Sequence, residues 1–232
     1  MNHRIINGLR VYAPASFNEL IDFALAENKN LIAVNAEKIL HANDNLKSLI
    51  NDNIGYPDGI GAVWALQKKG CKETVKIPGC ELWLKIIEQC HQKKSFYFVG
   101  ATDQVILATV TKLRAEFPSI CIVNYRNGFI TGDNDKQLLI SDLQNTKPDI
   151  VFVAMGSPRQ ENLIQELQKH HKAVYQGLGG SFDVYTGAVQ RAPKWWVKNN
   201  LEWAFRLIKQ PSRLQRHLHL VVFFCKLHLN QF

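Results

Sequence analysis

The sequence predicts an α/β protein with a Rossmann-like, open and mainly parallel sheet that helices cover on both faces. Short β-branched or aromatic runs alternate with longer helical patterns, as βαβ units require. Several of these runs end abruptly in small residues, as strands do when they deliver a loop to a binding crevice. The C-terminal segment instead mixes aromatic and basic residues at helical spacing. We therefore expect an α/β domain over residues 1–190 and a basic, amphipathic helical appendage over residues 191–232.

The first part of the chain contains the less regular elements. Residues 4–12 alternate weakly, as a short hairpin or an edge strand does, and a capping box opens a helix over residues 16–27. Residues 31–34 predict a short strand that turns into a helix at Asn35. Two proline-containing turns, at residues 57–59 and 77–79, each lead into a further helix.

From residue 95 onward the alternation is regular. Strands are predicted at 95–101, 120–128, 149–156 and 173–180, and helices at 102–117, 134–146 and 157–170. No clear helix follows the last of these strands. Crossovers of this length are right-handed and produce neighbouring parallel strands.

The appendage carries most of the net charge. Residues 191–232 contain eight basic residues and one acidic residue, so they hold +7 of the formal net charge of +8. Two or three helices are expected here, broken at Pro193 and Pro211. Cationic amphipathic helices with Trp and Phe are typical of a membrane-surface element, and the alternative is a helical pair that caps the core with a solvated basic face. The residues expected to face an anionic membrane are Arg206, Lys209, Arg213 and Arg216.

Cysteine usage and the hydropathy pattern limit the compartment. The five cysteines are scattered without a CxxC pair, which fits a reducing cytosol and disfavours a disulfide framework or a zinc site. The N-terminus lacks the apolar core of a signal peptide, and no run reaches the roughly 18 apolar residues of a spanning helix. We therefore expect a cytoplasmic protein that does not cross the membrane. The basic charge also suggests a competing hypothesis, a nucleic-acid-binding module.

The strongest binding signal lies between Asp149 and Asp183, where two apolar runs end in small residues. After the first run, we expect Ser157 to cap a helix whose first turn begins at Pro158. The N-terminus of such a helix favours an anion, and the side chains of its first turn would project toward that anion. The alternative is an ordinary well-capped helix. The candidate binding residues here are Gly156, Ser157, Arg159 and Gln160.

The second run ends in GLGGSFD, residues 177–183. Its first three residues begin like a dinucleotide fingerprint, but that fingerprint usually occupies the first βα turn of a fold, and this stretch follows the last predicted strand. A sugar or nucleotide pocket lined by Gly179 and Gly180 and closed by Asp183 fits better.

Further polar residues stand at other strand ends and turns. Asp58 lies in a Pro-Asp-Gly turn, where it is either a helix cap or a general base, and Asn35 could hydrogen-bond a sugar hydroxyl. Asp133 and Asp135 resemble the DxD pair that holds a metal on a nucleotide-sugar, but turn and capping chemistry explains them well. We expect no metal site and no cofactor.

Seven short motifs carry the most specific signal: VNAEKIL (34–40), YPDG (56–59), YFVG (97–100), VAMGSPRQE (153–161), GLGGSFDVYTG (177–187), RAPKWW (191–196) and LEWAFRLIKQPSR (201–213). In order and spacing they resemble the WecG/TagA/CpsF family of glycosyltransferases over essentially the whole chain. Within the family, NAEKIL and MGSPRQE are most similar to the branch that transfers N-acetylmannosaminuronic acid in enterobacterial common antigen synthesis. The alternative is the teichoic acid branch, which transfers N-acetylmannosamine.

This resemblance implies an inverting transfer from UDP-N-acetylmannosaminuronate to undecaprenyl-diphosphate-linked N-acetylglucosamine. The enzyme would act at the cytoplasmic face of the inner membrane, peripherally bound to its anionic surface, with no nucleic acid as partner. Whether the protein forms a homo-oligomer stays open.

The resemblance also implies roles for single residues. The family's proposed base falls on Asp58, its strand-end asparagine on Asn35, and the glutamine of its G-x-P-[KR]-Q-E motif on Gln160. The YFVG motif adds Gly100 to the expected substrate-binding residues. Two positions depart from the family pattern: Ala33 replaces a threonine, and Lys76 replaces an arginine, which removes bidentate geometry. We expect Lys76 or Arg191 to pair with the carboxylate of the donor sugar.

Overall fold

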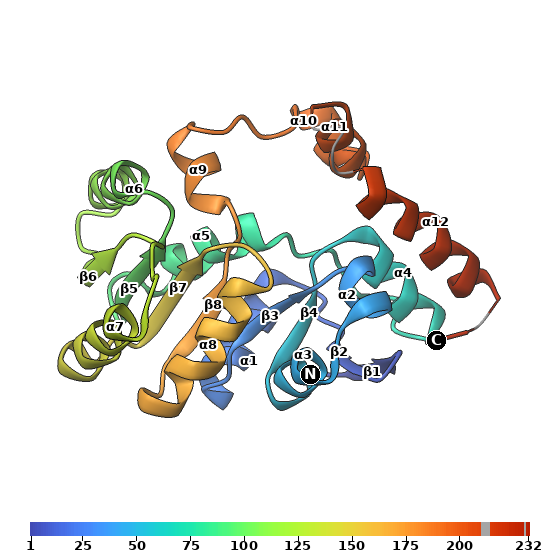
Figure 1. The fold of residues 1–232 in the computed structure, drawn as a ribbon. Helices are drawn as coiled ribbons and strands as arrows, with labels where there is room; N and C mark the ends of the chain where they lie inside the picture. Colours follow the sequence, from blue (N-terminus) through green and yellow to red (C-terminus); the bar gives the residue numbers. More distant parts are fainter. Residues whose placement is uncertain (210–213, 230) are drawn as a thin grey trace.

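The computed structural model describes residues 1–209, 214–229 and 231–232, without the side chains of Trp203, Arg206, Leu207, Lys209 and residues 214–219. It contains an eight-stranded sheet with the order β1-β2-β4-β3-β8-β7-β5-β6 (Figure 1). All neighbouring strands are parallel except β1 and β2, which form an antiparallel hairpin at one edge. The predicted Rossmann-like, mainly parallel sheet is therefore confirmed.

The strands are β1 (His3–Ile6), β2 (Leu9–Tyr12), β3 (Leu31–Val34), β4 (Ile54–Pro57), β5 (Ser95–Gly100), β6 (Cys121–Arg126), β7 (Ile150–Ala154) and β8 (Val174–Gly177). The helices are α1 (Phe17–Glu27), α2 (Ala36–His41), α3 (Asp44–Asp52), α4 (Ile60–Lys68), α5 (Gly79–Cys90), α6 (Asp103–Glu116), α7 (Asp133–Thr146), α8 (Arg159–His170), α9 (Ser181–Thr186), α10 (Lys194–Lys198), α11 (Glu202–Lys209) and α12 (Leu214–His228).

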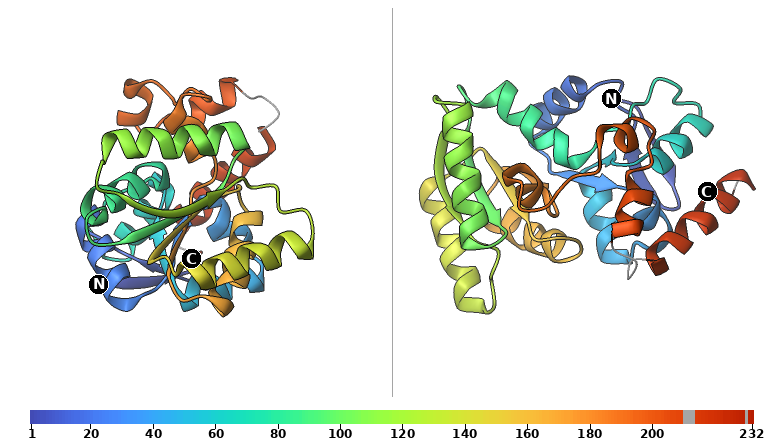
Figure 2. Two further views of the ribbon diagram at one scale, coloured as in Figure 1. Left: turned by 90° about the vertical axis from the view of Figure 1, so that its left-hand side faces the viewer. Right: turned by 90° about the horizontal axis from the view of Figure 1, so that it is seen from above.

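The helices cover both faces of the sheet, and β5 illustrates how the sequence directs this. Phe96 and Phe98 belong to a buried cluster with residues of α1, α5, α6 and α9, whereas Tyr97 and Val99 belong to one with residues of α7 and α8. This is the two-residue side-chain period of a strand, in a strand that is apolar on both faces because both faces are covered. The edge-on view in Figure 2 shows α6 and α7 on opposite sides of the sheet.

Two elements of the first half were not predicted from the sequence, namely β4 and the preceding helix α3. All four residues of β4 are buried, but Gly55 and Pro57 are residue types that weaken a strand pattern. Gly55 is required by close packing, because a Cβ there would lie 2.7 Å from the carbonyl oxygen of Arg10 and 2.8 Å from Ile50 Cγ2. Gly55 therefore weakens the sequence signal of β4 and at the same time allows this strand to pack against Arg10 and Ile50.

The last helix, α12, packs onto the first half of the sheet. Phe223 is fully buried, and Leu227 joins the same cluster as Ile32 and Val34. The Lys68 ammonium donates to the carbonyl oxygens of Leu227 and His228, so a cation caps the C-terminal end of α12. The inner face of α12 therefore caps the core, and Figure 1 shows α12 running along α4.

Of the four residues expected to face a membrane, Arg206 and Lys209 lie on α11 and Arg216 on α12. Arg213 and the expected break at Pro211 lie outside the described residues. Among the helices that are described, none is both long enough and apolar enough to cross a bilayer.

Candidate active site at the carboxyl edge of the sheet

The predicted site residues follow strands that are neighbours in the centre of the sheet. The strand order β4-β3-β8-β7 brings the carboxyl ends of four strands together. β3 pairs on one side with β4, which follows it in the chain, and on the other with the distant β8. Such a switch point is where open α/β sheets bind ligands. Asn35, Asp58, Gly156 and Gly179 all come within two residues of these strand ends.

Asp58 is held at the start of α5. Its carboxylate Oδ1 accepts a hydrogen bond of 2.7 Å from the backbone N–H of Gly79, the first residue of that helix. Pro78, the N-cap residue, offers no side-chain cap. Asp58, which directly follows β4, caps α5 in its place. The N-cap of α4, by contrast, is Gly59. The aspartate of the Pro-Asp-Gly turn thus lies at the positive end of a helix dipole, although not that of the helix following it.

Two buried polar side chains, Tyr56 and Gln176, lie next to the contact between Asp58 and Gly79. The amide Nε2 of Gln176 lies 3.3 Å from the hydroxyl of Tyr56 and 3.4 Å from the carbonyl oxygen of Gly79. Burial raises the pKa of Tyr56 well above 10.0, and the charge of Asp58 raises it further, so the phenol stays protonated at neutral pH. Gln176 was not among the predicted site residues, although its amide stands in an otherwise apolar strand.

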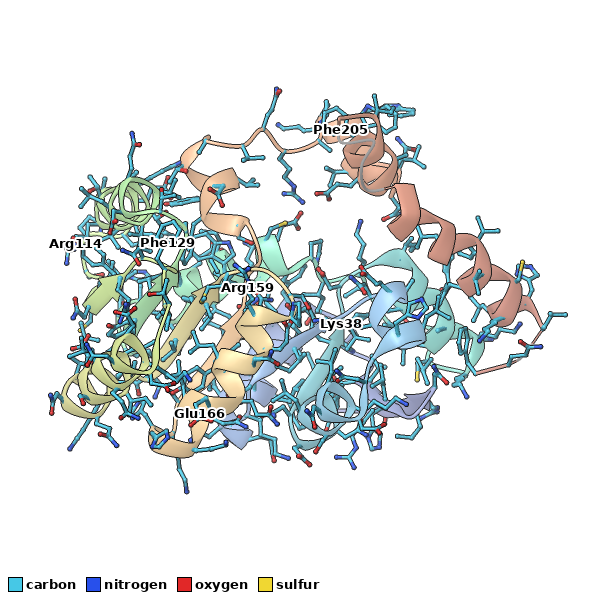
Figure 3. The ribbon with its side chains drawn as sticks, in the orientation of Figure 1. Lys38, Arg114, Phe129, Arg159, Glu166 and Phe205 are labelled. Carbon is cyan, nitrogen blue, oxygen red and sulfur yellow. The ribbon has the colours of Figure 1, made fainter. Side chains whose placement is uncertain are left out.

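On the other side of the sheet, a buried network joins α2, α8 and the loop after β8. Lys38 Nζ donates to Glu161 Oε1 at 2.7 Å and to the carbonyl oxygen of Ala33 at 2.8 Å. Gln160 Nε2 donates to the same carboxylate at 3.3 Å, and Gln160 Oε1 accepts from Gly179 N at 2.8 Å. Gln160 is therefore buried under the loop and bonded to Gly179, whereas the sequence predicted that its side chain projects from the first turn of α8 toward an anion. Figure 3 shows Arg159 at the start of α8 and Lys38 on α2.

Lys38 keeps Glu161 of this network in its ionised form. Burial alone would raise the pKa of Glu161, but the charge of Lys38 and its hydrogen bond outweigh burial and lower it. Both side chains are nearly inaccessible, with 11% of Lys38 and 4% of Glu161 exposed. Glu161 is consequently a carboxylate at neutral pH.

The start of α8 differs from the predicted one. Pro158 is the N-cap residue and Arg159 the first helical residue, while Ser157 is exposed and does not cap the helix. The reason lies in the turn before it, where Gly156 has a φ of +77° and its carbonyl oxygen accepts from Gln160 N at 3.0 Å. This backbone bond closes the turn without a serine cap.

The glycines of the site serve two different purposes. Gly100 has a φ of +143°, and a Cβ there would lie 2.3 Å from the carbonyl oxygen of Ala154, so it allows β5 to approach β7. Gly156 and Gly179 also have positive φ, but nothing lies within 4 Å of a Cβ built at either position. These two glycines therefore leave open space at the strand ends, as a ligand wall requires.

The loop after β8 leads into a helix that the sequence pattern did not predict. α9 spans only six residues, Ser181–Thr186, and contains Asp183 in its first turn. Its N-cap residue is Gly180, which makes no side-chain cap. The sequence therefore lacks the Ser, Thr, Asp or Asn that usually marks the start of a helix.

The remaining polar candidates have partners in the structure. Asn35 Oδ1 caps α2 by accepting from Lys38 N at 3.0 Å. Lys76 Nζ donates to Asn200 Oδ1 at 2.5 Å. The guanidinium of Arg191 donates to Glu81 and lies 3.8 Å from Glu202.

Asp133 and Asp135 lie at the start of α7, which follows the outermost strand β6 and not the central strands of the site. The Asp135 carboxylate accepts hydrogen bonds from the N–H and hydroxyl of Thr131, and Asp133 pairs with Lys136. In the part of the chain that the structure describes, no three His, Cys, Asp or Glu residues lie together as metal ligands would. Asp135 thus has the turn partner that the sequence suggested as the alternative to a DxD site, whereas Asp133 forms an exposed ion pair within the first turn of α7.

A comparison with protein families identifies the group of proteins to which the chain belongs. The glycosyl transferase WecG/TagA/CpsF family matches residues 6–232, which is nearly the whole chain. Members transfer sugars in the synthesis of cell-surface polysaccharides, from a nucleotide-sugar donor to a lipid-linked acceptor. The resemblance inferred from the motifs is confirmed: this chain belongs to the WecG/TagA/CpsF family of glycosyltransferases.

Proposed function

We propose that this glycosyltransferase moves N-acetylmannosaminuronic acid from UDP to a polyprenyl-diphosphate-linked N-acetylglucosamine, with inversion at the anomeric carbon. The observation that carries the proposal is the position of Asp58, a carboxylate oriented by the backbone of α5 at the switch point of the sheet. The NAEKIL and MGSPRQE motifs favour the uronate donor. N-acetylmannosamine transfer is the alternative within the family.

Asp58 acts as the general base. The 4-hydroxyl oxygen of the acceptor attacks the anomeric carbon of the donor, the bond from that carbon to the diphosphate breaks, and the hydroxyl proton passes to Asp58. The hydrogen bond from Gly79 fixes one carboxylate oxygen and thereby the direction of the other. A positioned general base contributes about 10²–10⁴-fold to the rate.

The departing UDP carries new negative charge, which the start of α8 stabilises. This helix has 12 residues, and its N-terminus follows the open glycine turn at Gly156. Backbone N–H groups and the helix dipole favour a diphosphate there, and Arg159 is exposed beside them. Gly179, Gly180 and Asp183 line the opposite wall, with the side-chain amide of Asn35 directed to a sugar hydroxyl. No step requires a metal ion.

Lys76 is the better candidate partner for the donor's carboxylate. Its ammonium donates to a neutral partner, the side-chain amide oxygen of Asn200, and an ammonium carries three donors. Arg191, in contrast, already lies beside two carboxylates of the protein, those of Glu81 and Glu202, so its positive charge is engaged within the protein. A Lys76→Met variant should lose its preference for UDP-N-acetylmannosaminuronate over UDP-N-acetylmannosamine.

The test is release of UDP from several UDP-sugars in the presence of a short-chain lipid-diphosphate-N-acetylglucosamine acceptor, with and without EDTA. We expect the uronate donor to be preferred and EDTA to have no effect. Asp58→Asn should lower turnover by about 10²–10⁴-fold while UDP still binds. Near-normal turnover in this variant would eliminate Asp58 as the base, and a preference for N-acetylmannosamine would support the teichoic acid branch.

We also propose that the appendage of residues 191–232 docks on the anionic cytoplasmic surface of the inner membrane. Its charge of +7 supports this, since each basic residue near such a surface contributes about 1 kcal/mol. Deleting the appendage would uncover the core around Phe223, so charge replacement is the sharper experiment. A variant with Arg206, Lys209, Arg213 and Arg216 replaced by glutamine should lose binding to vesicles that contain phosphatidylglycerol, and unchanged binding would refute the docking role.

A further inference from the structure

Three charged side chains connect the start of α5 to the appendage. Arg191 follows α9, Glu81 lies in the first turn of α5, and Glu202 is the first residue of α11. Arg191 donates to Glu81 and lies 3.8 Å from Glu202, so one guanidinium joins three chain segments.

This cluster is less solvated than an ordinary surface ion pair. The exposed fraction is 29% for the Arg191 side chain, 38% for Glu81 and 18% for Glu202. In the Lys85–Glu88 pair farther along α5, 53% and 59% are exposed. Because solvent screens exposed pairs most strongly, the Arg191 cluster constrains α5 more than the Lys85–Glu88 pair does.

The position of the cluster on α5 gives it a connection to the chemistry. Glu81 follows Gly79 by two residues, and Gly79 N donates to Asp58 at 2.7 Å. The N-cap residue Pro78 provides no side-chain cap, so external side chains hold this helix start. Asp58 and Gln176 hold Gly79 from the strand side, and Arg191 holds Glu81 from the appendage side.

We propose that Glu81 and Arg191 are positioning residues for the transfer reaction, because they fix the first turn of α5 so that the Gly79 N–H orients Asp58. The inference rests on the proposed role of Asp58 as the base. Glu202 extends the same constraint to α11, so the appendage supports catalysis through α5 in addition to any contact with lipid.

Removing the cluster should lower turnover without weakening donor binding. A displacement of about 1 Å at a reacting group can cost as much as 10²-fold in rate. We therefore expect Glu81→Gln and Arg191→Gln each to lower kcat by about tenfold, with KM for the UDP-sugar unchanged. Glu88→Gln is the matched control, since it removes an ion pair from the same helix away from Asp58, and it should leave kcat unchanged.

A double-mutant cycle with Asp58→Asn, measured under single-turnover conditions, separates positioning from a general loss of structure. If the cluster acts through Asp58, Glu81→Gln should have no further effect on the rate in the Asp58→Asn background. The same loss in both backgrounds, or no loss in either, would overturn the inference. Should Glu81→Gln fail to fold, Arg191→Gln takes its place in the cycle.

The cycle also distinguishes the two proposals. If Asp58→Asn alone retains near-normal turnover, the base assignment fails and the inference fails with it. If Asp58→Asn is slow but the Glu81 effect persists unchanged in that background, only the positioning role fails.

Discussion

The ammonium of Lys38 lies 2.7 Å from Oε1 of Glu161, and this ion pair joins the helix after β3 to the helix after β7. The same Glu161 oxygen accepts from Gln160, which in turn holds the backbone of Gly179. The shape of the loop after β8 therefore depends on a buried charge pair that a ligand does not need to touch.

This pair should make the stability of the protein depend on pH. The pKa of Glu161 is lowered from 4.5 in the folded protein, so its stabilising contribution is present above about pH 4.5 and is lost as the pH falls through the folded value. We expect the free energy of unfolding of the wild-type protein to fall more steeply below pH 4.5 than that of Glu161→Gln. At neutral pH this variant should be less stable by roughly 3 kcal/mol, because it leaves Lys38 buried without its partner.

Urea unfolding at a series of pH values measures both effects. Glu166→Gln, on the same helix, is the control, since Glu166 pairs with Lys169 in solvent and should affect unfolding little. Equal acid sensitivity in wild type and Glu161→Gln would show that another group controls acid unfolding.

The network also shows where sequence interpretation succeeds and where it stops. The regular alternation from β5 to β8 predicted the strands and helices there, because strand and helix periods are local properties of the chain. Asn35 and Asp58 likewise lie at the carboxyl edge of the sheet, as expected from the strand pattern, since parallel strands deliver their carboxyl ends to one side. The donors and acceptors of these side chains were not predictable in the same way. One partner of Asp58 is a backbone N–H that lies 21 residues away, and no side-chain motif marks a backbone donor.

Glu81 and Gln176 were missed for a related reason. An acidic residue in a first helical turn is ordinary for dipole compensation, and its pairing with a residue 110 positions away appears only in three dimensions. A single amide in an apolar strand, such as that of Gln176, does not indicate which residues will be its hydrogen-bond partners. The sequence pattern thus predicted the types of the elements but not the contacts between segments that are distant in the chain.

Gly177→Ala should disturb the loop after β8 through Gln160. A Cβ at this position would lie 2.5 Å from Gln160 Nε2 and 2.8 Å from its Cδ, so the amide must move away from Gly179. We expect UDP to bind up to about tenfold more weakly, because the loop would lose the hydrogen bond that holds Gly179, and about 1.4 kcal/mol for one such bond sets the upper limit of the added cost of ordering the loop. Calorimetric titration with UDP measures it. Gly132→Ala is the control, because nothing lies within 4 Å of its Cβ, and equal affinity in both variants would contradict the role of Gln160.

Gly100→Ala separates a packing role from a role in ligand contact. Its Cβ would lie 2.3 Å from the Ala154 carbonyl oxygen, in a backbone with a φ of +143°. Relief of this clash would require a shift of the β5–β7 ladder or a change in φ, and both cost free energy. We therefore expect the free energy of unfolding in urea to fall by about 1–3 kcal/mol or more. If Gly100 served only as a substrate contact, unfolding would be unchanged and only UDP affinity would fall.

Phe223→Ala tests how α12 is attached to the body of the protein. Phe223 is fully buried and packs beside Gly61, where a Cβ would lie 3.1 Å from its ring. Loss of a buried phenylalanine costs about 3–5 kcal/mol, and this loss falls on the contact between α12 and the body of the protein. We therefore expect α12 to detach while the sheet stays folded, and trypsin to cleave the C-terminal segment faster, as mass spectrometry of the fragments would show. Val222→Ala, at a neighbouring position that is 47% exposed, should leave the cleavage rate unchanged. Equal rates in the two variants would mean that α12 is held by the Lys68 cap and its outer turns, and that the buried ring contributes nothing to its attachment.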